Sequence, residues 1–147
     1  MRTRREAQER ATAADLRAVG EALTLALDQR LAPSGVSAFE LAIIEALHAA
    51  ESGRLRLTAL ADTTRSGLPR ISRAVAGLER RGLVEKVACA ADGRAINAVL
   101  TDSGIDVLRR TEECSSDTIR RVLFEALDEK EVAELGALLD KIVAGLE

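Results

Sequence analysis

The sequence predicts a mostly helical fold with one small β-hairpin, and three observations support this prediction. Apolar residues recur every three or four positions over most of the 147 residues, which is the period of an amphipathic helix. Two short runs of alternating apolar residues, 83–87 and 95–100, flank a polar turn, as in a hairpin. Before them lie a short helical run, a Ser66-Gly67 turn and a second helical run. This order is typical of a winged helix-turn-helix.

The first third of the chain is predicted to form two helices. The first covers roughly residues 12–31 and ends at the breaker cluster 32–35, which contains Pro and Gly. Ser37 and Glu40 have the spacing of a capping box, which predicts a second helix that runs to about Ala50. The apolar stripe of the first helix comprises Leu16, Val19, Leu23, Leu27 and Leu31.

The middle of the chain contains the helix-turn-helix. Residues 55–57 alternate as a brief strand that can pair with the hairpin, and Thr58 is expected to cap a short helix. The recognition-helix candidate runs from about Leu68 to Arg81, with Pro69 in its first turn and Gly82 at its end. Its buried stripe is predicted to consist of Ile71, Val75 and Leu78.

The C-terminal part is predicted to contain two further helices rich in Leu, Ile and Val. Thr101 is expected to cap a long helix that runs to about Phe124, and a box-like start at 128–131 begins the last helix. A single winged lobe has no room for both of these and the first helix. We therefore expect an isologous dimer, with an intramolecular bundle as the alternative. The predicted organisation is one domain, 1–147, with a lobe at about 37–100 and dimerisation helices at about 5–31 and 105–147.

Positive charge is concentrated on the winged segment, although the whole chain has a net charge of −3. Residues 54–94 carry nine Arg or Lys against four Asp or Glu, whereas the segments before and after are net acidic. Local cation density, rather than the net charge, attracts a polyanion. Because the major groove of duplex DNA admits one α-helix, the segment predicts binding of double-stranded DNA.

The candidate base contacts lie near the N-terminus of the recognition helix. They are Arg70, Ser72 and Arg73, which lie off the buried stripe. Recognition helices usually contact bases in their first turns. The alternative for Arg70 and Arg73 is that they are solvated surface charges.

The turn and the hairpin tip supply the other candidate contacts. Arg65 and Ser66 in the turn are candidate phosphate contacts. Arg94 at the tip is a candidate minor-groove or backbone contact, and Asp92 is expected to hold its guanidinium. The alternative for Arg94 is a local salt bridge of the turn.

The composition argues against several other classes of function. No apolar run reaches the ~18 residues of a membrane-spanning helix, and the N-terminus lacks the features of a signal peptide, so we expect a cytoplasmic protein. With one His, no Tyr or Trp and no phosphate loop, the chain is not expected to be an enzyme or to bind a cofactor. Cys89 and Cys114 have neither metal-site spacing nor the number of a disulfide framework. They are interpreted as small apolar residues.

Four segments, 16–47, 54–64, 68–86 and 92–104, resemble the multiple-antibiotic-resistance-regulator (MarR) family of bacterial transcription factors. The Asp-x-Arg of the wing and the following Leu-Thr-x-x-Gly are hallmarks of that family, at the expected distance from the recognition helix. The resemblance covers nearly the whole chain. It implies a homodimer of winged lobes that represses nearby genes and loses DNA affinity when a small-molecule effector or an oxidant acts.

Some positions depart from the family pattern. Gly67 precedes the recognition helix where Ser is common, Arg94 is the sole Arg at the tip of the wing, and the first helix lacks the reactive Cys of the peroxide-sensing branch. Two alternatives therefore stay open. One is a winged-helix module that binds proteins instead of DNA, and the other is a redox-sensing regulator that uses Cys89 or Cys114.

Overall fold

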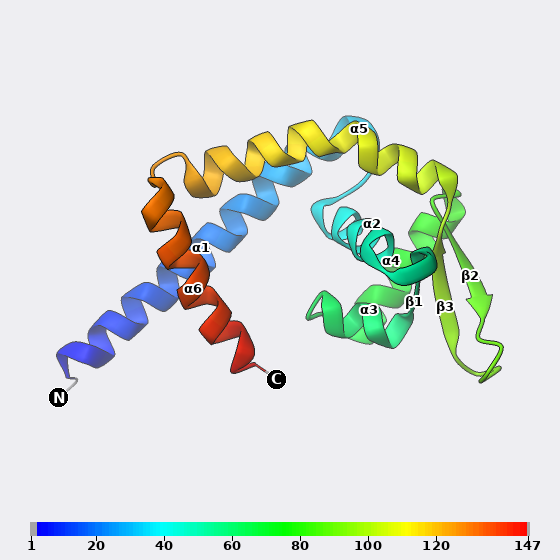
Figure 1. Ribbon diagram of the computed structural model, residues 1–147, viewed down its shortest axis with the longest axis horizontal. Coiled ribbons are helices and arrows are strands. Elements are labelled where there is room, and N and C mark those ends of the chain that lie inside the picture. The colour runs from blue at the N-terminus through cyan, green and yellow to red at the C-terminus, as the bar shows by residue number, and fades with distance from the viewer. Residues whose placement is uncertain (1–2, 147) are drawn as a thin grey trace. The chain divides into compact units, whose positions relative to one another are not determined.

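The computed structural model describes residues 3–146, which form two compact units (Figure 1). Residues 30–114 make up one unit, here called the lobe. The described residues before 30 and after 114 make up the other, here called the terminal unit. Met1, Arg2 and Glu147, which belong to the predicted 1–147 domain, lie outside the described residues.

Helices α1 (Arg4–Leu31) and α6 (Glu129–Ala144) dominate the terminal unit, together with the end of α5 (Asp102–Ile119). Helix α1 begins well before the predicted start near residue 12. The prediction missed its first turns because they are polar and carry no apolar stripe. A π-helical turn (Arg120–Phe124) follows α5. Asp128 caps α6 and forms a complete capping box with Glu131, as predicted.

The lobe is built around a buried apolar core. It contains α2 (Ala38–Ala49), α3 (Leu57–Thr63), α4 (Leu68–Arg80), a three-stranded sheet and the start of α5. The predicted capping box at α2 is confirmed. Ser37 Oγ accepts the Glu40 N–H at 3.1 Å, and Glu40 Oε2 accepts the Ser37 N–H at 3.0 Å. Side chains with no exposed surface include Leu31, Ile43, Ile44, Leu47, Leu60, Ile71, Val75 and Leu78.

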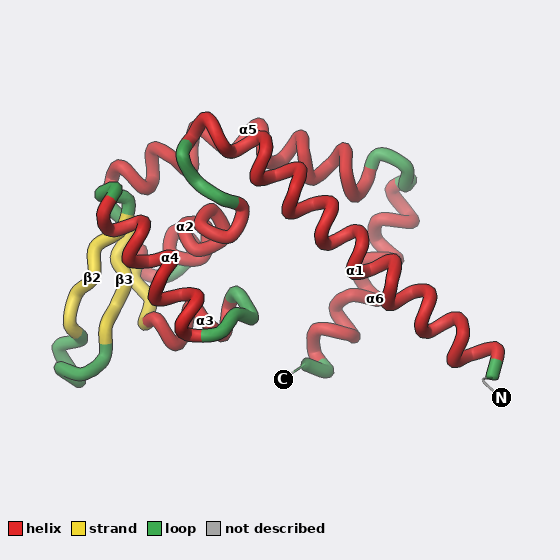
Figure 2. Tube along the Cα trace, turned by 180° about the vertical axis from the view of Figure 1, so that it is seen from behind, coloured by secondary structure: helices red, strands yellow, loops and turns green. Residues whose placement is uncertain are grey.

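The sheet forms the wing, which Figure 2 shows as the strand region at the edge of the lobe. Strands β2 (Val84–Ala88) and β3 (Ile96–Leu100) form the predicted hairpin, and β1 (Arg54–Arg56) pairs with the other side of β3. All pairs are antiparallel in the order β1-β3-β2. The predicted pairing of the brief strand with the hairpin is therefore confirmed.

The predicted role of Thr58 as a helix cap is wrong. Helix α3 begins one residue earlier, at Leu57, and its N-cap is Arg56, which makes no side-chain cap hydrogen bond. An N-cap residue needs a non-helical backbone, and here the extended residue is Arg56. Thr58 lies inside the first turn of α3, on the exposed side.

Candidate DNA-binding surface

The turn between α3 and α4 places Arg65 in a strained conformation on the surface. The Ser66 N–H donates to the Ala61 carbonyl at 2.9 Å, and the Arg65 N–H donates to the Asp62 carbonyl at 3.2 Å, which is a Schellman turn. Arg65 has φ of 49°, in the left-handed region that favours glycine. An L-residue with a side chain there costs roughly 1–2 kcal/mol. The turn therefore presents an exposed cation at an energetic cost.

Ser66 differs from its neighbour because its hydroxyl oxygen is buried. No hydrogen-bond partner of Ser66 Oγ is found among the described residues. The side chain thus lies inside the turn, and this placement does not favour a direct phosphate contact. Gly67 is the N-cap of α4 and offers no side-chain acceptor.

Helix α4 separates its buried stripe from a basic outer face. The predicted stripe of Ile71, Val75 and Leu78 is confirmed as fully buried. Arg73 is exposed on the opposite side of the helix, and Arg80 lies on the same side two turns later. Arg80 was not among the predicted contacts, although its spacing of seven residues from Arg73 is a signal that the sequence contains. Ser72 is also exposed, on the side of α4 that faces the wing.

Arg70 is exposed but lies against α2. Its guanidinium carbon is 3.8 Å from the centroid of the Phe39 ring, within the range of a cation–π interaction. Its predicted base contact stays a prediction, and any such contact has to keep or replace this stacking.

The C-terminal end of α4 is held by Gly82 and Arg81. Gly82 has φ of 72°, and the Leu83 N–H donates to the Leu78 carbonyl at 3.0 Å, so the predicted glycine end of the helix is confirmed. Arg81 Nη2 donates to Glu40 Oε1 at 2.5 Å, and Nη1 donates to the carbonyl of Gly35. The guanidinium of Arg81 is therefore engaged in contacts within the lobe, at and just before the start of α2.

The tip of the wing is closed by Asp92, but through a different partner from the predicted one. Asp92 Oδ1 accepts the backbone N–H of Arg94 at 3.0 Å. No ion pair between Asp92 and the guanidinium of Arg94 is found within residues 3–146, so the predicted guanidinium contact needs correction. A short Asp side chain reaches the N–H two residues on and closes a turn in this way. The Arg94 side chain is left exposed.

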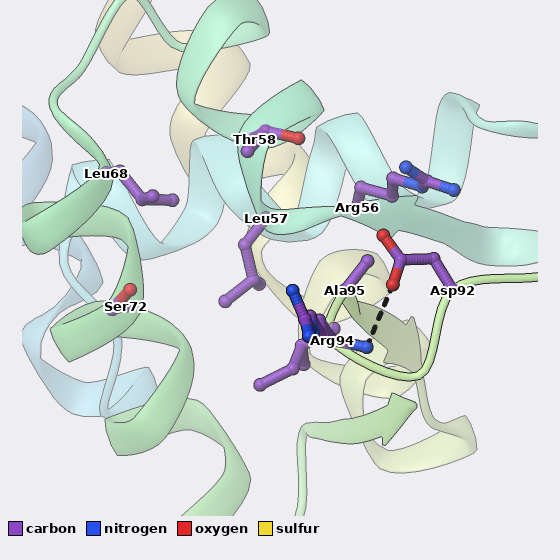
Figure 3. A pocket seen from close by; sticks show the side chains of 9 residues that line it. Arg56, Leu57, Thr58, Leu68, Ser72, Asp92, Arg94 and Ala95 are labelled. Carbon is purple, nitrogen blue, oxygen red and sulfur yellow. Dashed lines mark hydrogen bonds between the residues drawn. The ribbon is translucent and has the colours of Figure 1, made fainter. Parts of the chain in front are cut away.

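A groove of about 460 Å³ lies between α4 and the wing (Figure 3). In this view Leu68 and Ser72 lie on one side, Arg56, Asp92 and Arg94 on the other, and Leu57 between them. Two predicted contacts, Ser72 and Arg94, thus line one concave surface. The groove also contains Arg56, which was not among the predicted contacts.

The two cysteines have different surroundings. Backbone N–H groups of Asp92 and then Ala91 hydrogen-bond to the Cys89 sulfur and lower the pKa of this thiol, and Arg56 adds to the effect. Arg56 Nη2 lies 3.5 Å from Cys89 Sγ. Cys114 Sγ donates to the Thr111 carbonyl at 3.4 Å, within α5. Within residues 3–146, no group of three or more His, Cys, Asp or Glu side chains is arranged to hold a metal ion.

No helix within the described part of the chain has both the length and the apolar character needed to cross a membrane.

Comparisons with known proteins identify the fold. The sequence profile of the MarR family matches residues 34–95, which cover α2 to the tip of the wing. No curated protein matches the chain.

Two of the most similar solved structures come from Streptomyces coelicolor. One is Sco3205, a MarR family transcriptional regulator in complex with DNA, with 31% sequence identity and a TM-score of 0.88; the match covers 96% of this chain and 89% of that one. The other is AbsC, also a MarR family transcriptional regulator, with 27% identity and a TM-score of 0.85, covering 99% of this chain and 97% of that one.

BpsR of Bordetella bronchiseptica, whose DNA binding is regulated by 6-hydroxynicotinic acid, shares the fold. Its identity is 19% and its TM-score 0.81, and the match covers 90% of this chain and 98% of that one.

Proposed function

Because this chain belongs to the MarR family and is a winged-helix DNA-binding transcriptional regulator, we propose that it represses transcription by binding palindromic operator DNA as a homodimer. The observation that carries the proposal is the outer face of α4, where Arg73 and Arg80 are exposed. The strained Arg65 precedes this face, and the Arg94 side chain lies on the wing beside it. A protein-binding module would more often carry apolar or acidic residues at these positions.

Each basic residue has a proposed role. Helix α4 enters the major groove, where Arg73 and Ser72 contact base edges, and Arg70 does so if it leaves Phe39. Arg65 binds a phosphate, and Arg94 contacts the backbone or the minor groove. One bidentate Arg on guanine is worth ~1–3 kcal/mol of discrimination between bases. Arg73 is the strongest candidate for that contact because it is exposed and points away from the core of the lobe.

Dimerisation is supported by the apolar surface of the terminal unit. Its large exposed side chains are Leu16, Val19, Leu25, Leu138, Leu139, Ile142, Val143 and Leu146. Exposed apolar side chains gathered on α1 and near α6 are typical of a surface that is buried in an interface. We assign dimerisation to residues 5–31 and 105–147 and DNA binding to the lobe at about 37–100. A two-fold dimer implies half-sites about one helical turn, ~10 bp, apart.

Control by a small molecule is part of the proposal, because ligand regulation is named for one protein of the same fold. A second candidate mode of control is redox sensing. The lowered pKa of the Cys89 thiol favours Cys89 over Cys114 in this role. A cytoplasmic location fits either mode.

Selection of bound fragments from random duplex DNA, followed by footprinting, tests the function. We expect a palindromic site that the Arg73→Ala variant binds weakly. The control variant Arg54→Ala, changed at an exposed Arg of β1 outside the outer face of α4, should bind it normally. An asymmetric, unrepeated footprint contradicts the palindrome. Sedimentation of the full chain as a monomer at micromolar concentration contradicts the dimer, and absence of any selected sequence contradicts specific binding.

A further inference from the structure

The groove between α4 and the wing is concave and carries net positive charge. Arg56 and Arg94 supply two cations against the single carboxylate of Asp92, whose Oδ1 already accepts the Arg94 backbone N–H. Figure 3 shows these three residues along one side of the groove. The complete lining consists of Arg56, Leu57, Thr58, Leu68, Ser72, Asp92, Arg94, Ala95 and Ile96.

The other lining groups are hydroxyls and exposed apolar side chains. Thr58 and Ser72 each offer a hydroxyl donor, and both residues are exposed. Leu68 and Ile96 keep 42% and 43% of their surface exposed, although both line the groove. Cations and hydroxyl donors suit a phosphate, and the adjacent apolar surface suits the carbon face of a sugar. Together they match a deoxyribose phosphodiester better than a free inorganic anion.

The position of the groove identifies the part of DNA that can occupy it. If α4 lies in the major groove and Arg94 reaches the minor groove, the strand that separates the two grooves passes between α4 and the wing. That strand then runs along the groove described here. We propose that the groove binds one phosphodiester of this strand and that Arg56 is its principal cation. This inference rests on the proposed function and adds a contact to it.

Arg56 is well placed for this role. It is the last residue of β1 and the N-cap of α3, so two elements of the lobe fix its backbone. The contact of Nη2 with Cys89 Sγ at 3.5 Å orients its guanidinium and leaves the other N–H donors of the group for a ligand. Within residues 3–146 no ion pair involves Arg56, whereas Arg81 is paired with Glu40.

Variants of the full-length chain test the assignment by fluorescence anisotropy on the selected operator at several salt concentrations. Arg56→Ala is expected to weaken binding about tenfold for each half-site at low salt, as for loss of one charge-assisted hydrogen bond per protomer. The slope of log K against log salt should fall by about 1.8, the value for two phosphate contacts, because the dimer makes one such contact in each half-site. Arg56→Lys should retain most of the slope. Arg54→Ala is the matched control, because Arg54 lies on the same strand but does not line the groove.

Operators that carry a single neutral methylphosphonate locate the contact. One backbone position per half-site should weaken binding by the wild-type chain but have no further effect on Arg56→Ala, while the other sensitive positions weaken both proteins equally. Thermal unfolding checks that the variants are folded. If Arg56→Ala matches the wild type in affinity and slope while Arg73→Ala binds weakly, the groove assignment is overturned and the proposed function stands. If Arg73→Ala is also unaffected, the proposed function itself fails.

Discussion

The guanidinium carbon of Arg70 lies 3.8 Å from the centroid of the Phe39 ring, and the next residue, Glu40, accepts a hydrogen bond from Arg81 at 2.5 Å. Two arginines near opposite ends of α4 therefore hold adjacent residues of α2. This divides the basic residues of the helix by role. Arg70 and Arg81 orient the helix, whereas Arg73 and Arg80 remain on its outer face.

We predict that Arg65→Gly stabilises the fold and weakens DNA binding. Glycine removes the strain of φ 49°, worth roughly 1–2 kcal/mol, and part of this gain is offset by the greater freedom of glycine in the unfolded chain. A net gain of about 0.5–1 kcal/mol should appear in urea unfolding. Ser52→Gly is the control, because Ser52 has φ of 63° outside the basic surface. Ser52→Gly should stabilise the fold by a similar amount without changing DNA affinity. If Arg65→Gly binds DNA as tightly as the wild type, Arg65 is not part of the DNA interface.

Arg73→Ala and Arg94→Ala should weaken DNA binding in different ways. Arg73→Ala is expected to cost ~1–3 kcal/mol per half-site of the selected operator and to relax base preference at one position in each half-site. Arg94→Ala should weaken cognate and unrelated duplexes more evenly and make the salt dependence shallower, because a wing Arg neutralises phosphate or senses groove width. Titrations of both variants at two salt concentrations separate these effects. Unchanged affinity of Arg94→Ala for every duplex would exclude the wing from binding.

Gly104→Ala should strongly destabilise the lobe. A Cβ atom at Gly104 would lie 2.3 Å from the Leu83 carbonyl oxygen and 2.5 Å from Leu100 Cδ1, so the start of α5 would have to move. Overpacking of this kind typically costs ~1–3 kcal/mol. Gly93→Ala is the control, since nothing lies within 4 Å of its Cβ position. Equal thermal unfolding temperatures of the two variants would show that the close approach at Gly104 is not maintained in solution.

Cys89 should react with iodoacetamide at a lower pH than an unperturbed thiol. Because hydrogen bonds from the Asp92 and Ala91 N–H groups stabilise the thiolate, the pKa of Cys89 lies below its ordinary value and more thiolate is present at neutral pH. In a Cys114→Ser chain, the midpoint of the rate–pH profile should be lower when folded than in urea. Arg56→Ala should raise the folded midpoint part of the way. Identical midpoints in the folded and unfolded chains would contradict this environment.

Local signals in the sequence were sufficient to predict most element boundaries in the lobe. Ser37 with Glu40 and Gly82 each specify a helix end through hydrogen bonds to residues close in the chain, so the pattern contains the whole interaction. The same holds for the alternation that predicts the hairpin. The start of α1 was missed because its first turns lack an apolar period.

The candidate surface was harder to predict because its contacts join distant segments. Arg56 enters the groove only because β1 pairs with β3, and periodicity in a three-residue strand cannot reveal this. The sequence offers no reason to separate Arg70 from Arg73 as candidate base contacts, because the contact of Arg70 with Phe39 depends on how α2 packs against α4. For Asp92, charge alone suggested the guanidinium of Arg94, whereas the backbone N–H was the nearer donor.

The division of the chain into a continuous lobe and a unit made from both ends has a consequence for synthesis. Every residue of the lobe, 30–114, has been translated before the segment from 115 onward is made. Domains fold as units during translation, at ~5–20 residues per second. All contacts within the lobe therefore join residues that are translated before residue 115, whereas the terminal unit joins the first and the last segments of the chain. Assembly of the terminal unit therefore has to follow translation of α6, whereas folding of the lobe requires no residue beyond 114.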